Sequence, residues 1–197
     1  MFERRSAIAS ALARGGRDGA DGGRRLRLGE RRGWSLTQIA GFPDTIAELG
    51  KAAARILGAP LPEGIGEIVA ADGRQLLKTG PEQFWILASE LEDIAGRLQA
   101  AIAPAIGSVT PLSHSRTCIT VDGAAARELL AKGIPLDLHP EAFRVGRFAQ
   151  TGLHHTPVLL LRAGEDRYEI FALRTFALSV WDWLADAALP LGYDVVV

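Results

Sequence analysis

The chain has 197 residues, 48% of which are hydrophobic, and a formal net charge of −1. This length and apolar content predict a packed globular protein and exclude a disordered one. The charge near zero argues against nucleic acid as the main partner. The single cysteine, Cys118, excludes an intrachain disulfide framework and a cysteine-based metal site.

The first 33 residues differ from the rest of the chain in charge. They hold nine arginines and four acidic residues, a net charge of +5, so that the remainder carries −6. A basic arm of this kind is also typical of nucleic-acid binding. Seven glycines interrupt it, however, and no aromatic residue lies between Phe2 and Trp34 to stack on bases. We therefore expect residues 1–33 to be a mobile or partner-docking segment and residues 34–197 to form the domain.

The first half of that domain alternates strand and helix patterns. Apolar and polar residues alternate in the predicted strands, and the predicted helices show apolar spacings of three and four. The predicted elements, in chain order, are a strand at 35–40, a helix at 46–57, strands at 66–71 and 84–88 joined by a turn-rich link, a helix at 91–102 and a strand at 108–112.

The second half repeats this order. Its predicted elements are a strand at 116–121, a helix at 123–132, strands at 148–152, 158–162 and 168–173, a helix at 176–189 and a strand at 193–197. Asp122 suits the N-cap of the first helix, and Gly133 suits the residue after its end. Each half is close to β-α-β-β-α-β. The sequence thus predicts an α+β fold of two consecutive ferredoxin-like units that form one body.

Motifs for nucleotide or metal chemistry are absent from the sequence. Gly50-Lys51 is followed by alanine, so there is no Walker A loop, and no complete dinucleotide-binding glycine pattern occurs. His154 and His155 are neighbours, and on a strand they would point to opposite faces rather than toward one metal. We expect no catalytic, cofactor-binding or metal-binding residues in this chain.

The helix at 176–189 is too apolar for a helix with one buried face. Trp181 and Trp183 lie about 200° apart around it, so both cannot pack on one sheet. Burial beneath the N-terminal segment is one explanation. A subunit interface, where tryptophan is enriched, is the one we favour.

His114 and Arg116 flank Ser115 and would face the same side of a strand. Such a pair is able to bind an anion. An exposed edge-strand pair or an interface hydrogen bond is the favoured interpretation.

Several motifs of the chain resemble one family, the gamma subunit of heterotetrameric sarcosine oxidase. They are GPEQFW at 80–85, LSHSRT at 112–117, AKG at 131–133, PLDLHP at 135–140, Phe143, Gly146, AQT at 149–151, RTF at 174–176 and WDWL at 181–184. Two positions depart from the family pattern, since Ile134 stands where many relatives have cysteine and Thr175 where serine is usual.

The resemblance implies a non-catalytic subunit that assembles or stabilises an enzyme oxidising sarcosine to glycine. That reaction uses oxygen and tetrahydrofolate and yields hydrogen peroxide and methylenetetrahydrofolate. The partners would be alpha, beta and delta subunits, with FAD, FMN, NAD and tetrahydrofolate held by partner subunits and none by this chain. A cytoplasmic location without nucleic acid or membrane contact is expected. The candidate interface residues are Trp181, Trp183, His114, Arg116 and Arg174.

The resemblance also implies a fold similar to the folate-binding domain of aminomethyltransferases. An alternative function follows from it, a free-standing folate-binding or one-carbon-transfer module. Arg116, Arg174 and Asp137 would then be recruited for the folate tail and the pterin edge, although no spacing in the sequence demands it.

Overall fold

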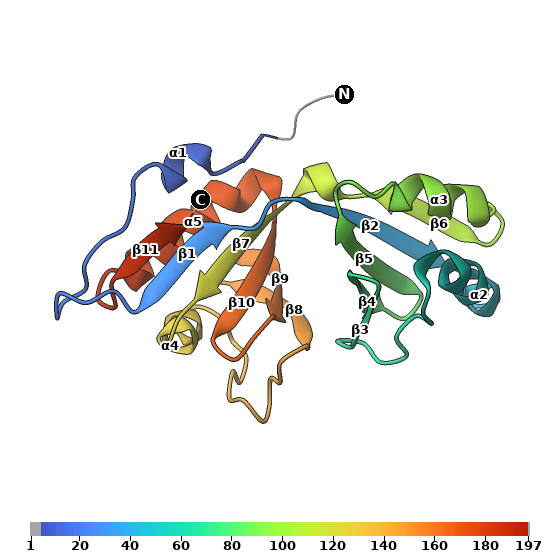
Figure 1. The fold of residues 1–197 in the computed structure, drawn as a ribbon. Coiled ribbons are helices and arrows are strands. Elements are labelled where there is room, and N and C mark those ends of the chain that lie inside the picture. The colour runs from blue at the N-terminus through green and yellow to red at the C-terminus, as the bar shows by residue number, and fades with distance from the viewer. Residues whose placement is uncertain (1–4, 197) are drawn as a thin grey trace. The chain divides into compact units, whose positions relative to one another are not determined.

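The computed structural model describes residues 5–196, which divide into two compact units, each built on a β-sheet (Figure 1). Unit 1 combines residues 5–32 with residues 114–196, and unit 2 is the continuous stretch 33–113. Unit 2 is therefore inserted in the sequence between the first strand of unit 1 and the remaining elements of unit 1.

Unit 2 carries a five-stranded antiparallel sheet, with strand order β3-β4-β5-β2-β6 among the described residues. Helices α2 and α3 contact each other, and Leu49, Leu57 and Leu98 from them are fully buried in one apolar cluster. The elements are β2 (Trp34–Gly41), α2 (Ile46–Leu57), β3 (Ile68–Ala71), β4 (Arg74–Gly80), β5 (Gln83–Ser89), α3 (Ile94–Ala101) and β6 (Gly107–Pro111).

Two expectations for unit 2 are wrong. The link before β5 contains a full strand, β4, which pairs with β3 through a two-residue turn at Asp72 and Gly73. Both turn residues have a positive φ, 49° for Asp72 and 75° for Gly73. Turns of this kind match the right-handed twist of the two strands that they join. The second helix begins at Ile94 rather than at Leu91, because the Asp93 side chain caps it by accepting from the Gly96 amide at 2.9 Å.

Unit 1 carries a six-stranded mixed sheet, with strand order β11-β1-β7-β10-β9-β8 within residues 5–196. Its elements are α1 (Ala9–Leu12), β1 (Leu26–Glu30), a 3-10 turn η1 (Ser113–Ser115, whose first residue belongs to unit 2), β7 (Arg116–Asp122), α4 (Ala126–Ala131), β8 (Phe148–Leu153), β9 (Thr156–Arg162), β10 (Arg167–Leu173), a 3-10 turn η2 (Arg174–Phe176), α5 (Ala177–Ala188) and β11 (Tyr193–Val196).

The basic N-terminal segment contributes both α1 and β1 to unit 1. β1 pairs in parallel with β11 and antiparallel with β7, and its Leu26 and Leu28 side chains are buried. The sequence predicts neither element, because the strand's alternation is short and lies among arginines and glycines. Its pairing partners are also distant in sequence. Residues 26–30 are thus a central strand of the sheet.

The two units repeat one plan, which confirms the predicted α+β class with two related halves. Each has the order β-α-β-β-β-α-β, from β2 to β6 in unit 2 and from β7 to β11 in unit 1. In unit 2 the last strand pairs directly with the first, whereas β1 intervenes between β11 and β7 in unit 1.

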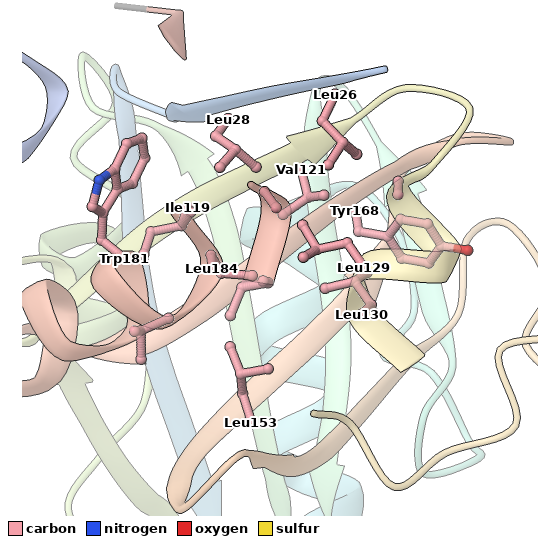
Figure 2. Close-up of a cluster of buried hydrophobic side chains, with 14 of the residues drawn as sticks. Leu26, Leu28, Ile119, Val121, Leu129, Leu130, Leu153, Tyr168, Trp181 and Leu184 are labelled. Carbon is pink, nitrogen blue, oxygen red and sulfur yellow. The ribbon is translucent and has the colours of Figure 1, made fainter. Parts of the chain in front are cut away.

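The core of unit 1 lies between its sheet and the helices α4 and α5. Figure 2 shows the converging side chains, which include Leu26, Leu28, Ile119, Val121, Leu129, Leu130, Leu153, Tyr168, Trp181 and Leu184. Asp122 is not the N-cap that the sequence predicts, because α4 starts only at Ala126, and the Asp122 carboxylate accepts from Arg27 at 3.1 Å instead.

A buried cation supports the loop that leads into this core. Arg162 is 3% exposed, and its guanidinium donates to the carbonyl oxygens of Phe143 and Glu165, each at 2.7 Å. These bonds compensate the loss of hydration that a buried charge suffers. Arg162 therefore ties the loop before β8 to the turn between β9 and β10.

Candidate functional site

The two tryptophans of α5 have different surroundings. Trp181 is 2% exposed and belongs to the core of unit 1, where α1 of the N-terminal segment contacts α5 (Figures 1 and 2). Trp183 is half-buried and packs at the margin of the same cluster. The N-terminal segment thus covers part of α5, the explanation that the sequence left open, and Trp183 is the tryptophan nearer the surface.

Trp183 packs closely against a glycine. A Cβ built on Gly133 would overlap the Cη2 and Cζ2 atoms of the indole, so the ring occupies the space that a side chain would need. The φ angle of Gly133 is not positive. Gly133 does follow Lys132, the C-cap of α4, as the sequence predicts, but it lacks the left-handed conformation that usually favours glycine there. Close packing against Trp183 is the reason for a glycine that the structure supplies.

An imidazole also lies near Trp183. The His154 ring is stacked near the indole, with ring centroids 6.2 Å apart and an interplanar angle of 30°, and His155 meets His154 edge-on at 4.0 Å. Gly133, His154, His155 and Trp183 together are called the Trp183 cluster below. Contacts of this kind hold an aromatic side chain in one orientation at modest entropic cost.

The sequence does not predict His154 as part of this cluster. Both histidines form the hairpin turn between β8 and β9 rather than lying on a strand, and His154 has a φ of 53°. Its backbone amide donates to the Gly133 carbonyl at 2.8 Å, which fixes the turn beside the end of α4. No local pattern in the sequence would have found it, because its position depends on how this turn meets α4.

The basic candidates gather at one end of the sheet of unit 1. Arg116 opens β7, and its strand partner Leu173 directly precedes Arg174. Arg116 donates to the Ser115 hydroxyl at 3.1 Å, and burial lowers the pKa of its guanidinium. His114 is exposed in the turn before β7, so it does not share a strand face with Arg116 as the sequence predicts.

Groups suited to covalent or metal chemistry do not converge among residues 5–196. No set of three or more His, Cys, Asp or Glu residues there is placed to hold a metal ion. Cys118 is buried, and burial together with the nearby Glu169 carboxylate raises the pKa of its thiol well above the ordinary value. Asp137 accepts from the backbone amide of His139 at 2.8 Å, a local turn contact.

No helix within residues 5–196 combines the length and the apolar character needed to cross a membrane.

The family model for "Sarcosine oxidase, gamma subunit family" matches residues 27–189 of the chain. The sarcosine oxidase subunit gamma of Arthrobacter sp is 36% identical over 190 residues, which cover 96% of this chain and 90% of that protein. The subunit gamma of Corynebacterium sp. strain U-96 is also 36% identical, over 69% of this chain and 67% of that protein.

Solved structures agree with these sequence relatives. A chain of the heterotetrameric sarcosine oxidase from Corynebacterium sp. U-96, in complex with pyrrole 2-carboxylate, matches with a TM-score of 0.84 and 32% identity, over 95% of this chain and 96% of that chain. The glycine cleavage system aminomethyltransferase T from Bartonella henselae matches with a TM-score of 0.63 and 16% identity, over 88% of this chain and 48% of that chain, a likeness of fold alone. The family match covers all but the first residue of β1 and every element from β2 to α5, and the chain belongs to the sarcosine oxidase gamma subunit family.

Proposed function

We propose that this chain is a non-catalytic gamma subunit that assembles or stabilises a heterotetrameric sarcosine oxidase. The observation that carries the proposal is the similarity to a gamma subunit of that enzyme over 96% of this chain and 90% of the relative. In this assembly alpha, beta and delta subunits are the partners. FAD, FMN, NAD and tetrahydrofolate are bound by partner subunits. The complex is cytoplasmic and turns sarcosine, oxygen and tetrahydrofolate into glycine, hydrogen peroxide and methylenetetrahydrofolate.

We further propose that the Trp183 cluster is part of the surface that meets the partners. Trp183 is an amphipathic, orientationally fixed side chain, which is the type of residue that dominates binding energy at interfaces. Phe176, the last residue of η2, is 43% exposed, and Leu178 in the first turn of α5 is 42% exposed. Arg116, Arg174 and His114 extend the candidate surface from the adjoining end of β7 and β10.

Co-expression with the large subunits tests this surface. In Trp183→Asp we expect loss of co-purification with a far-ultraviolet circular dichroism spectrum like that of the wild type, because the ring lies at the margin of the core. Trp181→Asp should instead destabilise the chain itself, since it places a charge in the core. Leu91→Asp changes a side chain that is 92% exposed on unit 2 and is the matched control. If Trp183→Asp yields as much complex as the wild type, the assignment of Trp183 to the interface is wrong.

The isolated chain provides the test of the non-catalytic role. Purified alone, it should show no flavin absorbance and no turnover of sarcosine. Isothermal titration with tetrahydrofolate should give no heat of binding. Micromolar affinity in that titration would favour the free-standing folate-binding alternative and contradict the role proposed here.

A further inference from the structure

Residues 8–25, called the strap below, run along the part of unit 1 that is formed by α5 and β11. Their apolar anchor is α1 and the residue before it, where Ile8, Ala11 and Leu12 are at most 4% exposed and join the core. Helix α1 contacts α5 and lies beside it in Figure 1. The rest of the strap is rich in glycine and contains no buried apolar residue before Leu26.

The strap also bonds to the outer edge of β11. The Arg17 amide donates to the Tyr193 carbonyl and the Tyr193 amide donates to the Arg17 carbonyl, both at 2.8 Å, in an isolated antiparallel bridge. A Cβ on Gly16 would collide with the Tyr193 carbonyl oxygen, so the strap approaches this closely because Gly16 lacks a side chain. On its other edge β11 pairs with β1, and the strap thus closes the sheet edge at Tyr193.

Three arginines of the strap pair with acidic residues of the body of unit 1. Arg14 meets Asp182 of α5 at 2.9 Å, Arg24 meets Asp194 of β11 at 2.5 Å, and Arg25 approaches Glu128 of α4 at 3.6 Å. The side chains of all three pairs are 40–61% exposed. Exposed pairs are individually weak and are screened by salt, so this group of contacts depends on ionic strength.

Backbone hydrogen bonds also join the strap to the segment before β11, since the Ala20 amide donates to the Pro190 carbonyl and the Arg25 amide to the Leu191 carbonyl, each at 3.2 Å. Closer to the anchor, a partly open pocket of about 380 Å³ lies between the strap and α5. Arg14 and Arg17 line the pocket from the strap, and Trp181, Asp186 and Tyr193 line it from the body of unit 1. No apolar side chain of residues 13–25 is buried, so this part of the strap opens at lower free energy than the core around it.

We propose that the strap is a releasable cover, which its arginine pairs hold closed over Trp181 and the outer edge of β11. In the closed state, which the structure shows, Arg17 occupies the edge at Tyr193. In the open state the Arg17 bridge is broken while the six-stranded sheet stays intact. Ionic strength shifts the balance between the two states.

Hydrogen exchange of the full chain tests this directly. In Arg14→Gln/Arg24→Gln the Tyr193 and Arg17 amides should exchange about fivefold faster or more, because two exposed pairs between the strap and the body of unit 1 are lost, along with the Arg24–Asp18 pair inside the strap. Raising the salt concentration should have the same effect on the wild type, and the amides of β7 and β10 should not change. The matched control is Arg5→Gln/Arg32→Gln, which removes the same charge outside the strap and should leave both amides at wild-type rates.

A second variant pair acts on the backbone bridge without changing charge. Gly16→Val should wedge the strap away from Tyr193 and accelerate exchange at Tyr193. Ala20→Val, on an exposed strap residue, should not. Unchanged exchange in Arg14→Gln/Arg24→Gln and at high salt would overturn the proposal, since apolar contacts alone would then hold the strap. Equal acceleration of all amides of unit 1 would overturn it too, because the strap would then open only when the whole unit unfolds.

Discussion

Gly133 and Trp183 act as one packing unit at the edge of the core. The indole fills the space of the missing side chain, and the Leu153 methyl closes it from a third side at 3.2 Å from the Cβ position. We expect Gly133→Ala to tilt the indole away from α4 and to lower the free energy of unfolding by about 1–3 kcal/mol, as overpacking does. Urea denaturation followed by the intrinsic tryptophan fluorescence of the chain measures this effect.

Gly152→Ala is the control within the same unit. A Cβ at that position would meet only the His154 carbonyl oxygen, at 3.8 Å, which is an ordinary contact. Its stability should equal or slightly exceed that of the wild type, because alanine restricts the unfolded chain more than glycine does. If both variants lose the same stability, the loss arises from backbone effects and not from Trp183.

Cys118 makes the stability of unit 1 depend on pH. The pKa of its thiol is raised well above the ordinary value of 9.0, mainly because burial penalises the thiolate. The folded chain therefore retains a proton that the unfolded chain loses above about pH 9, so the free energy of unfolding should fall as the pH rises through that range. Melting temperatures measured from neutral to alkaline pH should show this decline.

Cys118→Ala isolates that contribution. The variant should show a shallower decline of melting temperature at alkaline pH than the wild type. Some decline should remain, because burial also raises the pKa of Tyr168 from its ordinary value of 10.0. In the folded wild type the thiol should resist a thiol-specific reagent until denaturant is added. Rapid labelling of the folded chain would contradict the buried, protonated state.

At the scale of elements, strands with regular alternation and long apolar helices were predictable from the sequence. The α5 helix is an example, since its apolar length is visible in the chain and its bounds are Ala177–Ala188. Strand β4 was missed although the Asp72-Gly73 pair is a strong hairpin signal. Strand β1 was not predictable, because its stability comes from pairing with β7 and β11, which lie far along the chain.

The candidate site, like the fold, was predictable from the sequence only in part. The two tryptophans have the different surroundings that helical periodicity predicts, since Trp181 is buried and Trp183 is half-buried. The place of His154 in the cluster depends on how the β8–β9 turn meets α4 and α5, a tertiary arrangement without a local pattern. Whether these side chains meet a partner subunit stays a prediction.

Removal of the strap should expose an edge of the sheet of unit 1. A chain that begins at Arg25 keeps β1 and loses all of the strap except Arg25, and it should expose the outer edge of β11. Unprotected edge strands pair with other chains, so we expect concentration-dependent self-association by light scattering, whereas the full chain stays monomeric. Adding Val196→Lys to the shortened chain should restore the monomer, because a lysine on an exposed edge opposes pairing. A shortened chain that is monomeric at every concentration would argue against this role.

The whole molecule depends on its N-terminal strand. A chain reduced to residues 34–197, the domain that the sequence suggests, would lack β1 and leave β7 and β11 without their shared neighbour. We expect unit 1 of that chain to be unfolded or insoluble while unit 2, which is continuous in sequence, retains its sheet. Circular dichroism and backbone amide spectra would distinguish the units. Native signals from both units would show that β1 is dispensable.

The same connectivity has a consequence for synthesis on the ribosome. Unit 2 is complete once residue 113 has emerged, and its contacts can form at once. β1, made earlier, has to wait for β7 and then for β11 at the very end of the chain. Contacts between such distant segments form slowly, and an unpaired strand is prone to aggregate while it waits. Its surrounding arginines and glycines, which hide β1 from sequence prediction, also keep the nascent segment charged and poorly suited to premature pairing.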